Sequence, residues 1–260
     1  MSAYDLRSEG AVALITGGAS GLGRATAEVF GEAGYRVLIA DCDAERGEAT
    51  AADLTSAGII CAAVAADVAD PAQARAAVEA AVERWDRLDF VFNNAGILGA
   101  PRRVEEMDEE VLGRVLDVNL KGAFHICKHA VGQMLHGGGG SILNVASITA
   151  WRGAAFYAPY AAAKAGIAAL TRSSARRLGR HNIRVNCLSP GSIAGTGLSG
   201  SVDPARRRQD SAQLMRDIPV GRPASPRDVA HVALFLASPL ACHIHGAVLT
   251  VDGGESLGYQ

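Results

Sequence analysis

The sequence has no excess of charge of either sign. Its 260 residues include 25 Lys and Arg against 27 Asp and Glu, which gives a formal net charge of -2. A chain without a basic field has little attraction for a phosphate backbone or an anionic membrane surface. The composition therefore indicates no nucleic-acid partner and no membrane partner.

Long hydrophobic runs are also missing. No apolar stretch is long enough for a membrane span, and the N-terminal residues are polar and acidic before a short apolar run. The five cysteines are scattered and none belongs to a CxxC pair: Cys42, Cys61, Cys127, Cys187 and Cys242. Such a set is typical of reduced thiols, so we expect a cytoplasmic protein with no signal peptide, no disulfide framework and no metal held by cysteine.

What the sequence does contain is a regular alternation of two kinds of segment. Short apolar runs predict strands at residues 12–15, 36–40, 59–65, 88–92, 141–145, 184–188 and 247–251. Amphipathic stretches predict helices at residues 21–33, 44–57, 71–85, 107–135, 157–179 and 226–237. Such alternation is typical of βαβ units, and continuously apolar strands indicate a sheet covered on both faces. The predicted fold class is α/β, a doubly wound, Rossmann-type parallel sheet of seven strands with helices on both faces, in a single domain over residues 1–260.

One segment interrupts this alternation. Residues 191–222 form a long polar stretch that carries Arg206, Arg207 and Arg208. Long insertions outside the core are often active-site lids, so we expect a substrate lid here. The arginine run is typical of a solvated helix face, although it could also meet an anionic substrate.

A glycine-rich turn follows the first predicted strand. Between that strand and an amphipathic helix the chain reads TGGASGLG, residues 16–23. Glycines allow a sharp turn and a close approach to a pyrophosphate, and the helix N-terminus presents free N–H groups to its charge. The spacing is a variant of G-x-G-x-x-G, but it lies in the strand-to-helix context that such a site requires. The expected dinucleotide contacts are Gly17, Ser20, Gly21, Leu22 and Gly23.

Carboxylates lie at the ends of the next two predicted strands. Asp41 could accept hydrogen bonds from both hydroxyls of the adenosine ribose and would repel a 2′-phosphate. Neither neighbour of Asp41 offers a compensating cation, so the sequence favours NAD over NADP as cofactor. An alternative role is a helix N-cap, which Asp43 could supply equally well. Asp67, followed by Val68, could approach the adenine amino group.

A tyrosine and a lysine form the candidate catalytic pair. Tyr160 and Lys164 are four residues apart in a predicted helix, so their side chains share one face. A free tyrosine has a pKa of about 10, but a close ammonium and the charge of an oxidised nicotinamide favour the phenolate and lower that pKa. Tyr157 has Ala161 at the same offset and lacks a cation, which selects Tyr160. Ser147 follows the fifth strand, where its hydroxyl could hold the substrate oxygen while Tyr160 transfers the proton.

These motifs together resemble the short-chain dehydrogenase/reductase family, in its single-domain subgroup. The similarity runs from Val12 to Gly254, and the motifs stand in the family's order. They are TG at 16–17 with Gly21 and Gly23, NNAG at 93–96, Asn119, Ser147, Tyr160 with Lys164, PG at 190–191 and VDGG at 251–254.

The resemblance implies a catalytic tetrad. Tyr160 would be the general acid/base, and Lys164 would lower its pKa and bind the nicotinamide ribose. Ser147 would polarise the substrate oxygen. Asn119 would kink its helix and hold a water that links Lys164 to solvent. Asn93 would brace the central strands.

The resemblance also implies further cofactor contacts, at Asn94, Ala95, Gly96, Pro190 and Gly191. The sequence departs from the family's pattern after Gly191, because the expected threonine position is Gly195 and Thr196 follows one residue later. Contact between Thr196 and the nicotinamide therefore assumes a local adjustment of the loop, whereas Ile193 offers a backbone contact to the carboxamide. A homotetramer is implied as well, and the alanine-rich face of residues 157–170 would suit either helix–helix contact between subunits or packing within one.

Two further pairs of residues carry weaker signals. His125 and His129 are four apart on a predicted helix but have no third zinc ligand at suitable spacing, so no metal site is expected. Trp151 and Arg152 follow Ser147 closely enough to line a substrate pocket.

The leading hypothesis is an NAD-dependent oxidoreductase that moves a hydride between a nicotinamide and a secondary alcohol or ketone. An alternative is an NADPH-dependent 3-oxoacyl-carrier-protein reductase, against which Asp41 argues because such enzymes usually carry a basic residue near the second strand. A third reading is a dinucleotide-sensing protein without turnover, since the same fold supports binding alone. The complete tetrad argues against that reading.

Overall fold

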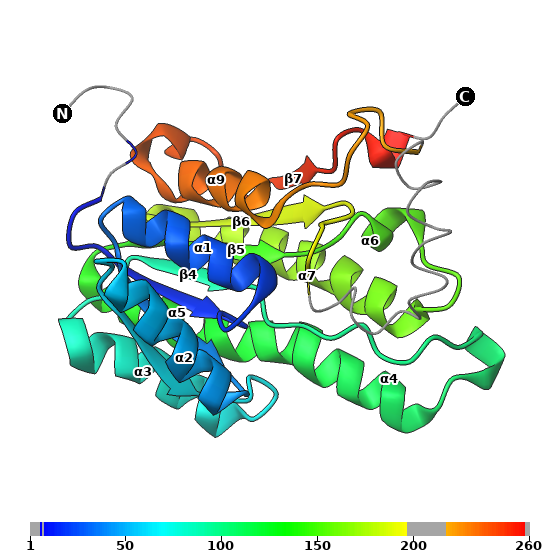
Figure 1. The fold of residues 1–260 in the computed structure, drawn as a ribbon, viewed down its shortest axis with the longest axis horizontal. Helices are drawn as coiled ribbons and strands as arrows, with labels where there is room; N and C mark the ends of the chain where they lie inside the picture. Colours follow the sequence, from blue (N-terminus) through cyan, green and yellow to red (C-terminus); the bar gives the residue numbers. More distant parts are fainter. Residues whose placement is uncertain (1–5, 7, 197–216, 258–260) are drawn as a thin grey trace.

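A parallel sheet of seven strands runs through the computed structural model of this protein, which describes residues 6, 8–196 and 217–257. The strands are ordered β3-β2-β1-β4-β5-β6-β7 (Figure 1). Their bounds are Val12–Thr16 (β1), Arg36–Asp41 (β2), Cys61–Ala65 (β3), Phe90–Asn93 (β4), Gly140–Val145 (β5), Ile183–Pro190 (β6) and Val248–Val251 (β7). The predicted fold class is confirmed.

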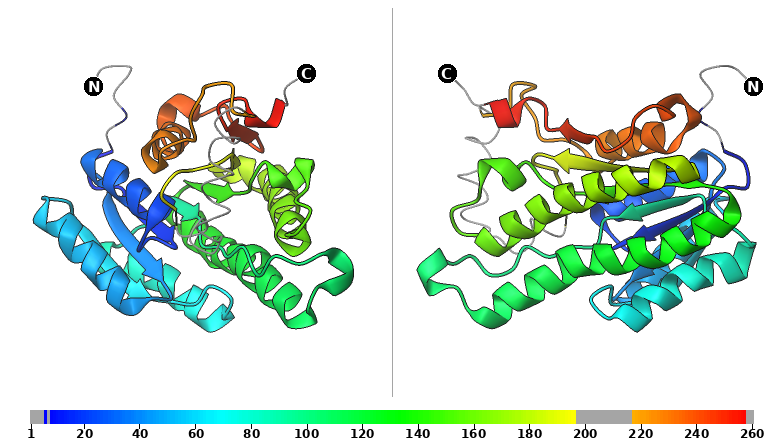
Figure 2. Two further views of the ribbon diagram at one scale, coloured as in Figure 1. Left: turned by 45° about the vertical axis from the view of Figure 1, so that its right-hand side comes forward. Right: turned by 180° about the vertical axis from the view of Figure 1, so that it is seen from behind.

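Helices cover both faces of the sheet (Figure 2). Leucines, valines and alanines of α1, α2 and α9 pack on one face, and those of α3, α5 and α7 pack on the other. The helices are Gly21–Glu32 (α1), Ala44–Ser56 (α2), Pro71–Trp85 (α3), Glu109–Leu116 (α4), Ala123–Gly137 (α5), Thr149–Arg152 (α6), Ala158–Leu178 (α7) and Pro226–Ala237 (α9).

The central strands carry apolar residues at successive positions because each face of the sheet has its own core. Along β1, Ala13 and Ile15 belong to the core beside α1, whereas Val12 and Leu14 belong to the core beside α3 and α5. Successive side chains of a strand point to opposite faces, so both sets must be hydrophobic when both faces are covered.

The helix predicted over residues 107–135 is interrupted. Asp108 precedes α4, a π-helical segment follows at Asp117–Gly122, and α5 continues from there to Gly137. A π-helical turn holds an extra residue, which breaks the regular ladder of carbonyl and N–H groups around Asn119. The short helix α6 was not predicted, because four residues carry no periodic pattern.

The order of the strands fixes where a ligand can bind. The chain winds from β1 outward to β3, then returns across the sheet to β4 and winds in the other direction. In open parallel sheets, ligands bind beyond the carboxyl ends of the strands at such a switch point. Among the described helices, none is long and apolar enough to cross a membrane.

Candidate active site

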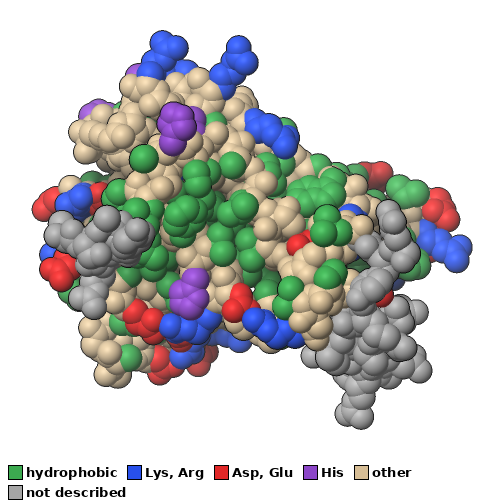
Figure 3. All heavy atoms as spheres, turned by 90° about the horizontal axis from the view of Figure 1, so that it is seen from above, with side chains coloured by type: hydrophobic (Ala, Val, Ile, Leu, Met, Phe, Trp, Pro, Cys, Tyr) green, Lys and Arg blue, Asp and Glu red, His purple; other side chains and the backbone are tan. Residues whose placement is uncertain are grey.

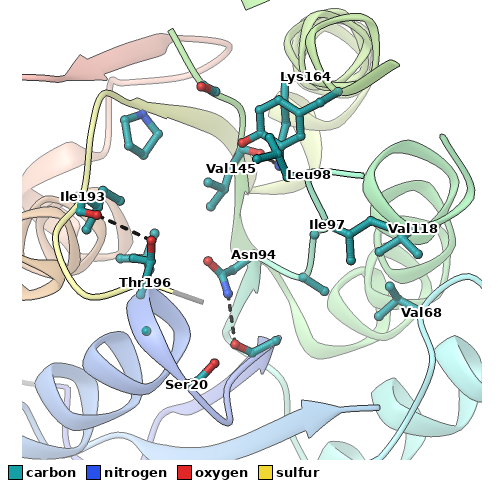
Figure 4. Close-up of a pocket in the computed structure, with 18 of the residues that line it drawn as sticks. Ser20, Val68, Asn94, Ile97, Leu98, Val118, Val145, Lys164, Ile193 and Thr196 are labelled. Atoms are coloured by element: carbon teal, nitrogen blue, oxygen red, sulfur yellow. Dashed lines mark hydrogen bonds between the residues drawn. The ribbon is translucent and has the colours of Figure 1, made fainter. Parts of the chain in front are cut away.

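A cavity of about 940 Å³ opens at the carboxyl edge of the sheet. Residues at or just after the ends of β1 through β6 line it, together with residues of α1, α4, α7 and the π-helical segment. Figure 4 shows Ile193 and Thr196 on one side, Lys164 and Leu98 on the other, and Asn94 between them. This size falls within the range of cavities that enclose a small molecule or cofactor.

The glycine-rich turn is shaped by contacts that exclude side chains. Gly17 and Gly21 have φ angles of 63° and 51°, which L-residues rarely adopt. A Cβ atom on Gly23 would lie 2.0 Å from the carbonyl oxygen of Gly17, so the start of α1 can approach the turn only with glycine there. The side chain of Ser20, the N-cap of α1, makes no capping hydrogen bond.

The end of β4 holds this turn in place. Asn94 Nδ2 donates to the carbonyl oxygens of Thr16 at 3.0 Å and Gly17 at 3.1 Å. Thr16 Oγ1 in turn accepts hydrogen bonds from the N–H groups of Asn94 and Ala95. Asn93 points elsewhere, because its Nδ2 donates to Asn144 Oδ1 at 2.9 Å and so joins β4 to β5. The NNAG motif therefore connects the turn to the centre of the sheet.

The two carboxylates expected to contact the adenosine, Asp41 and Asp67, have different surroundings. Asp41 accepts hydrogen bonds from the N–H groups of Ala19 at 3.0 Å and Asp43 at 3.1 Å. Asp43, not Asp41, caps α2, so the alternative role of Asp41 as an N-cap is wrong. Asp67 forms an ion pair with Arg114 of α4 at 2.9 Å. Arg114 also lines the cavity, a contact that no sequence signal indicated.

Ser147, Tyr160 and Lys164 meet on one side of the cavity. Burial raises the pKa of the Tyr160 phenol, and its hydrogen bond with the Ser147 side chain offsets part of that rise. Burial lowers the pKa of Lys164 to about 8. The Lys164 ammonium lies 5.5 Å from the centre of the Tyr160 ring and donates to the Val145 carbonyl oxygen at 2.7 Å. Burial therefore outweighs the effect of the neighbouring side chains, and the lowering of this pKa by Lys164 together with an oxidised nicotinamide stays a prediction.

Asn119 lies within the π-helical segment and is buried. Its Oδ1 accepts from the N–H of Ile97 at 2.8 Å, and its Nδ2 donates to the carbonyl oxygen of Ile97 at 2.8 Å. The side chain therefore fixes the loop after β4, one residue beyond Gly96. Asn119 does not itself line the cavity.

The loop after β6 forms the opposite wall. Pro190, Gly191, Ser192, Ile193 and Thr196 line the cavity. Thr196 lies close to the glycine-rich turn, because a Cβ atom on Gly21 would be 3.5 Å from its Cα atom. Thr196 Oγ1 also donates to the Ile193 carbonyl oxygen at 3.5 Å.

Most of the predicted site residues line this single cavity. The exceptions are Asn119 and Gly23, which lie just behind its wall. Trp151 and Arg152 were expected to line the substrate pocket, but they are not among the lining residues, because they lie on the exposed helix α6 and Arg152 donates to the Glu255 carbonyl oxygen. The predicted lid, residues 191–222 with its arginine run 206–208, falls largely outside the described residues.

Several lining residues were not predicted. They are Ala40, Cys42, Ala66, Ile97, Arg114, Val118, Val145, Ala146 and Ser192. Most are neighbours of predicted residues at strand ends, so the convergence of the strand ends at one edge of the sheet also brings them to the cavity. Within the described ranges, no group of three or more His, Cys, Asp or Glu residues could hold a metal ion. His125 Nδ1 lies 3.2 Å from the Val68 carbonyl oxygen.

Comparison with known proteins gives consistent matches over nearly the whole chain. The sequence model of the family described as "Enoyl-(Acyl carrier protein) reductase" matches residues 17–256. The chain is 40% identical over 249 residues to (2S)-[(R)-hydroxy(phenyl)methyl]succinyl-CoA dehydrogenase subunit BbsD of Thauera aromatica, covering 95% of this chain and 96% of that protein.

Solved structures agree with these sequence matches. Levodione reductase superposes with a TM-score of 0.93 at 36% identity, covering 97% of this chain and 100% of that one. The 3-ketoacyl-(acyl-carrier-protein) reductase from Brucella melitensis, complexed with NADH, superposes with a TM-score of 0.87 at 36% identity, covering 95% and 99%.

The chain therefore belongs to the short-chain dehydrogenase/reductase family, as its motifs predicted. This family binds nicotinamide cofactors, and the relatives of this chain are oxidoreductases acting on alcohols and ketones.

Proposed function

We propose that this protein is an NAD-dependent enzyme that transfers a hydride between a nicotinamide and a secondary alcohol or ketone. The observation that carries the proposal is the convergence of Ser147, Tyr160 and Lys164 on the same cavity as the glycine-rich turn and Asp41. A site that only sensed a dinucleotide would require the turn and the carboxylate. It would have no need of a buried phenol beside a hydroxyl and an ammonium.

The residues of the cavity fit a nicotinamide dinucleotide. The Ser20 hydroxyl and the first N–H groups of α1 are left for the pyrophosphate. Asp41 accepts two backbone hydrogen bonds, and a carboxylate has about four acceptor positions, so it retains capacity for the ribose hydroxyls. Among the described lining residues the cations are Arg114, which pairs with Asp67, and Lys164 on the catalytic side. A 2′-phosphate beside Asp41 would thus meet a carboxylate and no unpaired cation, which favours NAD.

The chain's own residues handle the proton. When bound, the nicotinamide accepts a hydride from the alcohol carbon or gives one to the carbonyl carbon. Ser147 Oγ holds the substrate oxygen beside the Tyr160 hydroxyl. In reduction Tyr160 gives its proton to that oxygen, and in oxidation its phenolate takes the proton away. Because burial raises the pKa of Tyr160 and oxidation needs the phenolate, the rate of oxidation should increase as the pH rises.

Asn119 supports this chemistry indirectly. Both polar atoms of its side chain bind Ile97, so the side chain positions the loop after β4. We therefore propose that the main chain of the π-helical segment, and not the Asn119 side chain, supports the expected water relay to Lys164.

The substitution Tyr160→Phe tests the proton transfer. It should lower kcat by a factor of about 100 or more while NADH binding stays unchanged, because the phenolic proton is lost and the cavity wall is kept. Tyr157→Phe, three residues earlier, is the matched control and should retain activity. Near-normal turnover by Tyr160→Phe, in a folded protein that binds NADH, would show that another group transfers the proton.

Cofactor preference is tested by titrating NADH and NADPH into the protein and following nicotinamide fluorescence. Tighter binding of NADH supports the assignment of Asp41. Tighter binding of NADPH would favour the alternative function, a 3-oxoacyl-carrier-protein reductase. The Brucella relative of that activity was solved with NADH, so turnover of an acyl-carrier substrate must be compared with turnover of simple secondary alcohols.

Self-association as a homotetramer is part of the proposal. Among the residues that the structure describes, β7 pairs with β6 alone and ends the sheet, with Leu249 and Thr250 exposed. Figure 3 shows hydrophobic side chains gathered on the face that carries β7 and α9. Phe124 of α5 is 52% exposed. The apolar side chains on the face of β7 and α9 support a contact between subunits, and light scattering after gel filtration would measure the assembly.

We further propose that the whole chain acts as one catalytic domain in the cytoplasm. All five cysteines are unpaired, which supports a reducing compartment. Localisation of a tagged protein by microscopy would test this.

A further inference from the structure

Glu255 links the end of the chain to the wall of the cavity. It begins a short 3-10 helix at Glu255–Leu257, directly after the VDGG motif. Its Oε2 accepts from the Ser192 N–H at 2.7 Å, and its Oε1 accepts from Ser192 Oγ at 3.1 Å. Ser192 lines the cavity, so a carboxylate 63 residues away holds both hydrogen-bond donors of one wall residue.

The position of Glu255 is itself fixed. Asp252 accepts hydrogen bonds from the N–H groups of Gly254 at 2.9 Å and Ser256 at 2.8 Å, which shapes the turn that carries Glu255. Arg152 Nη1 donates to the Glu255 carbonyl oxygen at 2.9 Å and ties the turn to α6. A Cβ atom on Gly191 would lie 2.6 Å from Glu255 Oε2, so the carboxylate packs directly on the backbone of the wall.

Hydrogen bonds engage the backbone donors on either side of Ile193. The N–H of Gly191 donates to Val251, that of Ser192 to Glu255, and that of Ala194 to Ala224. Ile193 and Ala224 form a parallel bridge, in which the Ala224 N–H donates to the Ser192 carbonyl oxygen and the Ala194 N–H donates to the Ala224 carbonyl oxygen. In this pattern the N–H of Ile193 points away from Ala224. Within the described residues, the Ile193 N–H makes no hydrogen bond.

We propose that Glu255 is a positioning residue for the nicotinamide. By binding both donors of Ser192, it fixes the backbone so that the Ile193 N–H is presented to the nicotinamide carboxamide. Glu255 acts through Ser192 and does not touch the cofactor itself. This inference rests on the proposed NAD-dependent function.

The test compares two ligands that differ only at the nicotinamide end. NADH and ADP-ribose are titrated into the wild-type protein, Glu255→Ala and Glu255→Gln, with Glu48→Ala on the exposed face of α2 as the matched control. We expect Glu255→Ala to weaken NADH binding roughly ten-fold and ADP-ribose binding less than about two-fold, because only the nicotinamide end depends on the wall. Glu255→Gln keeps one acceptor oxygen and should lie between the wild type and Glu255→Ala.

Each other result overturns either the inference or the proposed function. If the affinities for NADH and ADP-ribose fall by the same factor in both Glu255 variants, the residue has a general structural role and the inference fails. If NADH binding is unchanged in Glu255→Ala, the Ile193 amide does not depend on it and the inference also fails. If the wild type binds ADP-ribose but not NADH, or binds neither, the proposed function itself is overturned and the inference with it.

Discussion

Replacing Lys164 by methionine should change the pH dependence of folding. Lys164 is 4% exposed, and burial lowers its pKa from 10.5 to about 8. That difference corresponds to about 3 kcal/mol of extra cost for keeping the ammonium charged in the folded protein. At pH values between the two pKa values, the unfolded chain holds a proton on Lys164 that the folded protein has released. Stability therefore rises with pH through this interval and is lowest below about pH 8.

The quantity to measure is the free energy of unfolding of the wild type minus that of Lys164→Met. It should rise by about 2.5 kcal/mol between about pH 7 and about pH 10. The lost hydrogen bond to Val145 adds an offset that does not change with pH. Urea unfolding followed by circular dichroism gives both free energies at each pH, and taking the difference removes every group that titrates equally in both proteins.

A matched control separates burial from the loss of any positive charge. Lys128→Met removes an exposed lysine from α5, and its difference from the wild type should stay flat across the same pH range. A flat or falling difference for Lys164→Met would refute the reasoning, because it would mean that the charged ammonium is not penalised in the fold.

Two further predictions concern the cofactor end of the cavity. Gly23→Ala should abolish NADH binding in a fluorescence titration, because the new methyl group would lie 2.0 Å from the Gly17 carbonyl oxygen. The control Gly132→Ala lies in an open part of α5 and should leave NADH binding intact. It should also stabilise the fold by up to about 1 kcal/mol. Saturating NADH should slow alkylation of Cys42, which is exposed and lines the cavity, but not of exposed Cys242, as followed by mass spectrometry. Retained NADH binding by Gly23→Ala, or equal protection of both thiols, would contradict the placement of the dinucleotide along the glycine-rich turn.

The fold was predictable because its pattern is repeated and local. The central strands are short runs such as VALIT in β1 that are buried on both faces, and the longer helices carry a stripe of buried apolar residues. Two such signals fail where the chain is irregular. The π-helical segment at Asp117–Gly122 has no periodicity of its own, and α6 is too short to have one.

Much of the candidate site could also be predicted, because strand ends of a parallel sheet converge. Asp41, Asn94, Ser147 and Gly191 follow β2, β4, β5 and β6 or end them, so the sheet brings them to one edge whatever the loops do. Tyr160 and Lys164 join them through helical spacing alone. The pKa of Tyr160 was not predictable in the same way, because it depends on burial, and burial is set by the whole fold.

The unpredicted part of the site consists of pairs joined only by tertiary structure. Arg114 and Asp67 are 47 residues apart, and Ser192 and Glu255 are 63 apart, with no motif linking either pair. Each pair lies at one end of the cavity, the first near the expected adenine position and the second near the expected nicotinamide position. The strand ends bring the predicted site residues together, and we expect these ion-paired and hydrogen-bonded partners to determine how rigidly each end of a dinucleotide would be held. Affinity at the two ends should therefore respond separately to substitution, which is why ligands that contain only one end distinguish a positioning residue from a structural one.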